Sequence, residues 1–237
     1  MNDSELPGTR DQRGRDLDEQ SALDRAIRAR RMIRSFTDRP LHPEQLDDAL
    51  DLARRAPSAG NTSAVEFIVL DTPTSVDRYW KTTLTEDKRA RFRWAGLLTA
   101  PALVILSTRP GAYVERYNEP DKARPGLGQR TEAWAQPFWW IDAGMVAQNL
   151  LLIAADRGWG AALFGLFDHE RAVRDAFGVP DDRRLVCTIA IGEPGEGDEP
   201  GRSASRGRPP IDQIIHRQGF SSDPGHHRST SNLLGTD

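Results

Sequence analysis

The stretch WWIDAGMVAQNLLLIAADRGWG, residues 139–160, predicts a helix that is apolar on nearly every side. It carries little charge before Asp156, so we expect the helix from Trp139 to Asp156 to be buried all round. A chain of 237 residues is long enough for one sizeable domain, yet a monomer of this size rarely encloses such a helix completely. Because apolar burial stabilises by about 25 cal/mol per Å², the segment favours pairing with a second copy.

The other segments mix strands and helices without strict alternation. Ser21 begins a predicted first helix that ends at a run of arginines, and Pro43 begins a second helix. Short β-branched runs predict strands over 65–71, 101–108, 160–167 and 184–194. Helical patterns cover 74–96 and 168–178, the latter with Asp168 as its cap and Gly178 at its end. Residues 109–130 are dense in Gly and Pro and predict a mobile loop.

Composition sets the limits of the folded part. Residues 1–20 and 221–237 are polar and charged, so we expect disordered tails around a single domain of residues 21–220. Within that domain, 195–210 has the composition of a linker, and IDQIIHR, residues 211–217, predicts a short amphipathic helix.

Several classes of function are disfavoured. The formal net charge is −3, which argues against nucleic acid as a partner, and the five histidines lack metal-ligand spacing. Cys187 is the single cysteine, so it forms no internal disulfide, and we expect it to be buried. No uninterrupted apolar run reaches the roughly 18 residues of a membrane span, and the N-terminus lacks a hydrophobic signal region. We therefore expect a soluble, cytoplasmic protein without a membrane partner.

The segment RARRMIRSF, residues 28–36, places four arginines within seven residues of a chain that is slightly acidic overall. Guanidinium groups donate paired hydrogen bonds in a fixed plane, which suits a phosphate. The alternative is a solvated helix end, where cations also favour the helix dipole.

Four motifs in order resemble the flavin-dependent nitroreductase family over roughly residues 24–218. They are RRMIRSF at 30–36, APSAGNT at 56–62, the apolar helix with its flanks at 142–160, and GRPPIDQIIH at 207–216. The resemblance implies an α+β fold with three α/β/α layers, a mostly antiparallel central sheet and a domain-swapped style of homodimer. It also implies bound FMN, with NADH or NADPH as co-substrate.

The resemblance assigns the cofactor site residue by residue. Arginines from both ends of the chain would bind the phosphate and ribityl chain, and the turn at 57–63 would reach the flavin. Backbone amides after the third strand would face the N5 and O4 edge of the ring. The implied set is Arg30, Arg31, Met32, Arg34, Pro57, Ser58, Asn61, Ser63, Gly165, Leu166, Arg206 and Arg208.

The implied reaction is hydride transfer from NAD(P)H to a nitroaromatic, quinone or related small-molecule acceptor by a ping-pong mechanism. No His, Cys or carboxylate pair is arranged for acid–base work, so no catalytic side chain is assigned. Two alternatives stay open: a flavin-dependent dehydrogenase of a biosynthetic intermediate, and a flavin-binding protein without turnover. The aromatic residues Trp134, Phe138, Trp139 and Trp140 fit either a substrate wall or packing around the dimer.

Overall fold

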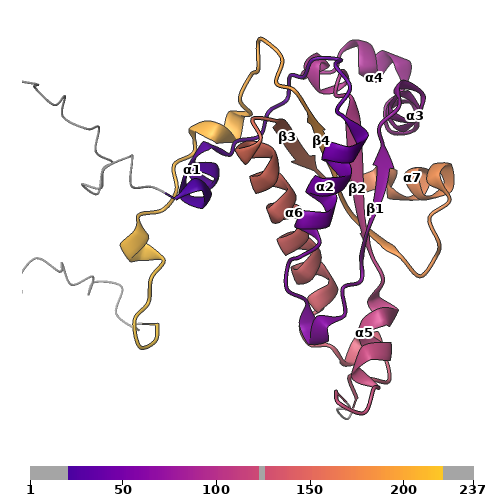
Figure 1. Ribbon diagram of the computed structural model, residues 1–237, viewed down its shortest axis with the longest axis vertical. Helices are drawn as coiled ribbons and strands as arrows, with labels where there is room; N and C mark the ends of the chain where they lie inside the picture. Colours follow the sequence, from indigo (N-terminus) through magenta and orange to yellow (C-terminus); the bar gives the residue numbers. More distant parts are fainter. Residues whose placement is uncertain (1–20, 123–125, 221–237) are drawn as a thin grey trace, which may run out of the picture. The chain divides into compact units, whose positions relative to one another are not determined.

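The computed structural model describes residues 21–122 and 126–220, so both predicted tails lie outside the described residues. The chain divides into two compact units, Met1–Glu199 and Pro200–Asp237, with the boundary inside the segment of linker composition. The first unit contains a four-stranded sheet with helices on both of its faces (Figure 1). The described part of the second unit holds two short 3-10 turns, Arg202–Ser205 and Ile211–Gln213. Only the second of these falls in the segment expected to form an amphipathic helix, so that prediction is wrong.

The sheet consists of β1 (Val65–Leu70), β2 (Ala102–Thr108), β3 (Gly160–Phe164) and β4 (Arg184–Gly192). Its order is β1-β2-β4-β3, and each neighbouring pair is antiparallel. Every residue of the central strand β2 is buried, which explains its uninterrupted apolar run. All four predicted strands are confirmed, and Cys187 is buried in β4 as expected.

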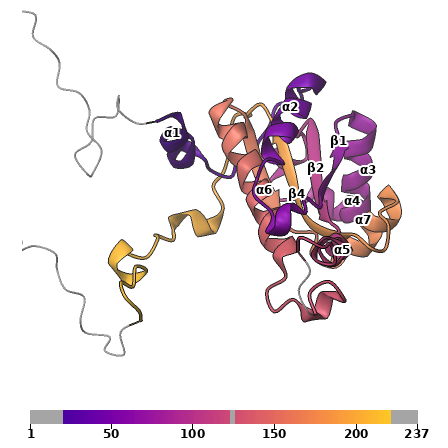
Figure 2. The same ribbon diagram turned by 60° about the horizontal axis from the view of Figure 1, so that its bottom comes forward.

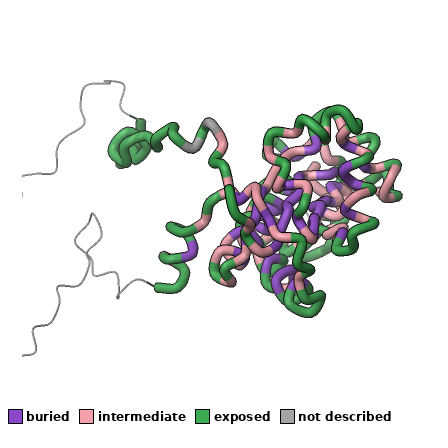
Figure 3. Tube along the Cα trace, turned by 90° about the horizontal axis from the view of Figure 1, so that it is seen from above, coloured by how far each residue is buried: buried purple, intermediate pink, exposed green. Residues whose placement is uncertain are grey.

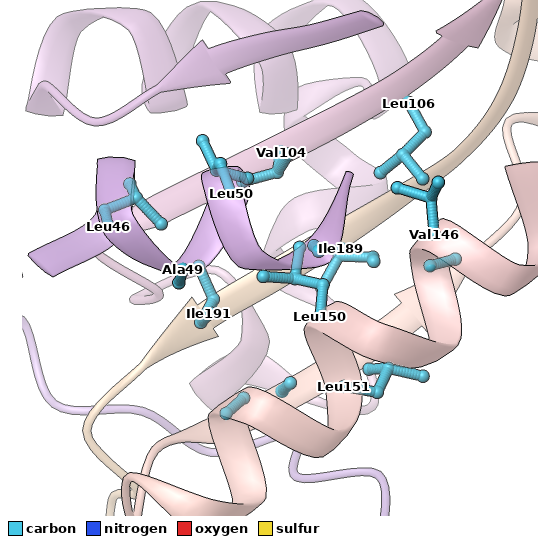
Figure 4. Packing of buried hydrophobic residues seen from close by; sticks show 14 of the residues in the cluster. Leu46, Ala49, Leu50, Val104, Leu106, Val146, Leu150, Leu151, Ile189 and Ile191 are labelled. Carbon is cyan, nitrogen blue, oxygen red and sulfur yellow. The ribbon is translucent and has the colours of Figure 1, made fainter. Parts of the chain in front are cut away.

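Helices α2 (Pro43–Ala53) and α6 (Phe138–Asp156) cover one face of the sheet, and α1 (Ala22–Ala29) packs on α6. Side chains from α2 and α6 interdigitate with those of β2 and β4 (Figure 4). Leu46, Leu150 and Ile189 are at most 1% exposed in this layer. Each such side chain stabilises the fold by roughly 1.5–3 kcal/mol through burial alone.

Helices α3 (Pro73–Thr83), α4 (Glu86–Ala90) and α7 (Glu170–Phe177) lie on the opposite side of the sheet (Figure 2). Tyr79 and Val173 pack there against Leu103 and Ile105 of β2. The three α/β/α layers therefore match the expectation. Gly178 ends α7 with a left-handed φ of 64°, as predicted, but Asp168 does not cap the helix. It lies instead in a 3-10 turn, Phe167–His169, that precedes α7.

The segment expected to be a loop at 109–130 contains helix α5 (Pro110–Tyr117), so that prediction is wrong in part. Pro110 occupies the first helical turn, where a missing N–H is tolerated. Tyr113 and Tyr117 lie one turn apart, and both rings contact Trp134 edge-on. Packing against aromatic residues from outside the helix therefore stabilises a segment whose composition indicated a loop.

Helix α6 is buried on one face within this chain rather than all round. Val146, Leu150 and Ala154 lie on the buried face, whereas Trp140 and Ile141 are 41% and 46% exposed. Figure 3 shows the buried residues gathered in the interior of the first unit, with exposed residues around them. Among the described residues, α6 is also the helix long and apolar enough to cross a membrane, a test that core helices of soluble proteins pass too.

Candidate functional site

The arginine-rich segment is held between β3 and the chain that follows β4. The N–H of Ile33 donates to the carbonyl of Ala161 at 3.0 Å, and Gly195 donates to the carbonyl of Ser35 at 2.8 Å. A Cβ at Gly160 would lie 2.8 Å from Cγ2 of Ile33, so the close approach requires glycine there. The sequence thus places the arginines at a fixed position along the edge strand.

Arg30 and Arg31 line an open cavity of about 200 Å³ beside α6. The guanidinium of Arg34 lies 5.1 Å from the centre of the Trp94 ring and donates to the carbonyl of Met32 at 3.3 Å. Among residues 21–122 and 126–220, no carboxylate forms an ion pair with these three guanidinium groups. Other arginines of the molecule are paired, for example Arg109 with Glu115, Arg116 with Asp121 and Arg183 with Glu66. The segment therefore presents positive charge that an external anion could neutralise.

Met32 contributes in an unexpected way. Its sulfur accepts a hydrogen bond from the backbone N–H of Leu163 at 3.3 Å, so the side chain points to β3 rather than outward. The backbone N–H of Arg34 donates to Asp198 Oδ1 at 2.5 Å. The side chain of Met32 thus helps to attach the segment to the sheet, and its backbone is the part left for a ligand.

Residues 58–63, called here the 58–63 turn, adopt an unusual backbone conformation. Gly60, Asn61 and Ser63 have φ values of 65°, 56° and 51°, in the left-handed region that glycine favours. The hydroxyl oxygen of Ser58 accepts from the N–H of Ser63 at 3.0 Å and closes the turn. Asn61 is exposed at its tip, and the preceding Pro57 is exposed as well. The predicted turn residues are therefore brought together, and the amide of Asn61 faces outward.

Three residues that the sequence analysis did not single out hold this turn. Asp142 of α6 accepts from the N–H of Ala59 at 2.9 Å and from the hydroxyl of Tyr113 at 2.7 Å. Arg116 of α5 donates from Nε to the carbonyl of Gly60 at 2.8 Å. Burial, with the hydrogen bond and charge of Asp142, raises the pKa of Tyr113 far above its usual value, so its hydroxyl remains a donor. A carboxylate near the start of an apolar helix, Asp142, was the available signal.

Gly165 and Leu166 follow the end of β3. Leu166 is 5% exposed and packs into the core, so its backbone alone could meet a ligand. The ring of Phe167 lies against Gly165, where an added Cβ would be 3.0 Å from Cζ. Phe167 is 84% exposed and has a φ of 45°, an uncommon value for a bulky residue.

The remaining predicted site residues, Arg206 and Arg208, lie outside the first unit. They belong to the second unit and are exposed there, so their role at the phosphate stays a prediction. Trp134 and Trp139 pack with Tyr113, while Phe138 and Trp140 are 37% and 41% exposed. The described residues contain no group of three or more metal-ligating side chains.

Comparisons with known proteins agree with this geometry. The profile of a family described as "Nitroreductase family" matches residues 27–193. The 4-nitrobenzoate reductase of Nocardioides sp. (strain LMS-CY) is 28% identical over 220 residues, which cover 82% of this chain and 89% of that protein. NfrA2 of B. megaterium has a TM-score of 0.66 at 20% identity, covering 86% of this chain and 77% of that chain. An FMN-dependent nitroreductase of Clostridium difficile R20291 has a TM-score of 0.57 at 20% identity, covering 83% and 99%. The solved structures share the fold of this chain.

Proposed function

Because the chain belongs to the nitroreductase family and is therefore an oxidoreductase, we propose that it binds FMN and passes hydride from NADH or NADPH to a small acceptor. Nitroaromatic compounds, quinones and related molecules are the acceptor class. The 4-nitrobenzoate reductase, similar over most of its length, supports the nitroaromatic part of this class.

The observation that carries the proposal is the set of guanidinium groups at Arg30, Arg31 and Arg34. None of them forms an ion pair with a carboxylate of the described residues, and two of them line the same cavity. Other arginines of the chain do pair with a carboxylate, as Arg54 and Arg55 do with Asp51. The donor set therefore fits the phosphate of a mononucleotide.

FMN supplies the hydride chemistry when it is bound, and the chain supplies binding and orientation. The arginines would hold the phosphate, and Ser58 and Asn61 would offer polar groups to the ring or ribityl chain. Backbone N–H groups near Gly165 would stabilise negative charge on the reduced ring. With one face of the bound flavin ring open, NAD(P)H and the electron acceptor would occupy that face in turn. This alternation is the basis for expecting ping-pong kinetics.

A second copy of the chain would complete the site. The cavity of about 200 Å³ in one chain is smaller than the roughly 300–1,000 Å³ typical of small-molecule pockets. Among the described residues, Trp140 and Ile141 at the N-terminal end of α6 are 41% and 46% exposed, so this part of the helix surface is apolar and only partly covered. Burying this face against a second copy favours a homodimer in which two chains enclose the flavin.

The experiment is FMN binding to the purified chain, followed by flavin fluorescence, with Arg30→Ala and Arg34→Ala as variants. Each should lose roughly 1.5–3 kcal/mol, the contribution of a charge-assisted hydrogen bond, or about 10- to 150-fold in affinity. Arg171→Ala removes the same charge from the exposed surface of α7 and should leave affinity unchanged. Unaltered affinity in both site variants would refute the phosphate assignment. Bound flavin that neither NADH nor NADPH reduces would favour the dehydrogenase or the non-catalytic alternative.

A further inference from the structure

Asp142 lies on the buried face of α6 and is 2% exposed. A carboxylate is costly to bury unless its oxygens accept hydrogen bonds. Here both donors, the N–H of Ala59 and the hydroxyl of Tyr113, reach the same atom, Oδ2. Since they come from the 58–63 turn and from α5, one oxygen of α6 joins two segments that are distant in sequence.

The 58–63 turn needs such an external attachment. Three of its residues, Gly60, Asn61 and Ser63, have left-handed φ values, and two of these are not glycine. Backbone in this region costs of order 1–3 kcal/mol per residue and persists where the surroundings hold it. Among the described residues, Asp142 and Arg116 supply hydrogen bonds that reach the turn from outside.

Helix α5 lies against the same turn (Figure 1). The ring of Tyr117 would be 2.9 Å from a Cβ placed on Gly60, and Arg116 binds the Gly60 carbonyl. The α5 segment also packs on Trp134, one of the aromatic residues that fit either a substrate wall or packing around the dimer. The turn, α5 and Trp134 are therefore parts of one packed cluster.

We propose that Asp142 is a positioning residue for the flavin, fixing the 58–63 turn so that Ser58 and Asn61 are presented to it. Through Tyr113, Asp142 also ties the turn to α5. A change in α5 should therefore alter flavin affinity. The inference rests on the proposed function for the identity of the ligand. The attachment of the 58–63 turn to Asp142 does not depend on the proposed function, because this hydrogen bond forms without any ligand.

The test compares Asp142→Ala, Asp142→Asn and Tyr113→Phe with Tyr79→Phe as matched control. Tyr79 is 1% exposed and its hydroxyl bonds to Thr188 at 2.9 Å on the other side of the sheet, so its loss costs a comparable hydrogen bond. Two readouts are used: the dissociation constant for FMN, and hydrogen exchange of the amides at 59–63 in the flavin-free chain. The second readout does not depend on activity.

We expect Asp142→Ala to weaken FMN binding by about tenfold or more and to speed exchange at 59–63. Asn keeps one oxygen that can accept from both donors, so Asp142→Asn should restore most of the affinity. Tyr113→Phe should lie between these, and Tyr79→Phe should resemble the unmodified chain in both readouts.

Equal FMN affinity in Asp142→Ala and Tyr79→Phe would overturn the inference, as would unchanged exchange at 59–63. If Asp142→Ala does not fold, Asp142→Asn and Tyr113→Phe decide the question by the same two readouts. A chain that binds no FMN at all would instead refute the proposed function. The exchange experiment would then still report whether Asp142 holds the turn.

Discussion

Replacing Gly60 by alanine is the sharpest test of how α5 shapes the 58–63 turn. Gly60 has φ 65° and ψ 13°, and an added Cβ would lie 2.9 Å from Cε2 of Tyr117 and 3.4 Å from Cγ of Arg116. Two separate costs follow, because alanine disfavours this backbone conformation and because the methyl group meets the tyrosine ring.

The first cost is about 1–2 kcal/mol for a non-glycine residue in the left-handed region. The second is about 1–3 kcal/mol, the usual range for adding a methyl group to a packed site. Gly178 at the end of α7 separates the two, since it has φ 64° but open space around its Cα. We expect Gly60→Ala to destabilise by roughly 2–5 kcal/mol and Gly178→Ala by only about 1–2 kcal/mol.

The assay is urea unfolding of both variants at one protein concentration, with the free energy of unfolding taken from the linear dependence on urea. A double-mutant cycle completes it, because Tyr117→Ala removes the clashing ring. In that background the Gly60→Ala penalty should fall to the value for Gly178→Ala. Equal penalties for Gly60→Ala and Gly178→Ala in the unmodified chain would refute the argument that Tyr117 restricts the turn.

Two further predictions concern assembly and the cysteine. Ile141→Asp puts a charge on the exposed apolar face of α6 and should convert the proposed dimer to a folded monomer in sedimentation, whereas Arg171→Asp on α7 should leave the assembly intact. An Ile141→Asp protein that sediments as the unmodified one would exclude this face as the interface. Burial raises the pKa of the Cys187 thiol to about 12, so a thiol reagent should modify it at neutral pH only after unfolding. Rapid labelling of the folded protein would contradict that expectation.

The strands and the main helices could be predicted because their signals are local. β2 and β4 are continuous runs of β-branched and apolar residues, and both are central strands. Pro43 and Gly178 marked helix ends through their own backbone preferences. For these elements, the residues that determine the structure are the residues that form it.

Helix α5 and the contacts of Asp142 could not be predicted for the opposite reason. The Gly and Pro content around α5 indicated a loop. The helix is stabilised by Trp134, which lies seventeen positions after Tyr117, the last residue of α5. Asp142 was visible as a carboxylate within an apolar helix, but its partners come from residues 59 and 113. A pattern within one segment carries no information about which distant donor reaches it.

The composition of α6 has a physical explanation if all its surroundings are considered together. One face packs on the sheet through Val146 and Leu150, so it must be apolar. At its N-terminal end the same face meets the Ala59 N–H and the Tyr113 hydroxyl, and an apolar residue there would leave both donors unsatisfied. The exposed side carries Trp140 and Ile141 at its N-terminal end, where water would favour polar residues. A second copy of the chain over that face would complete the burial that the sequence predicts. Asp142 would then be a buried position of the helix where a polar side chain stabilises the fold more than an apolar one.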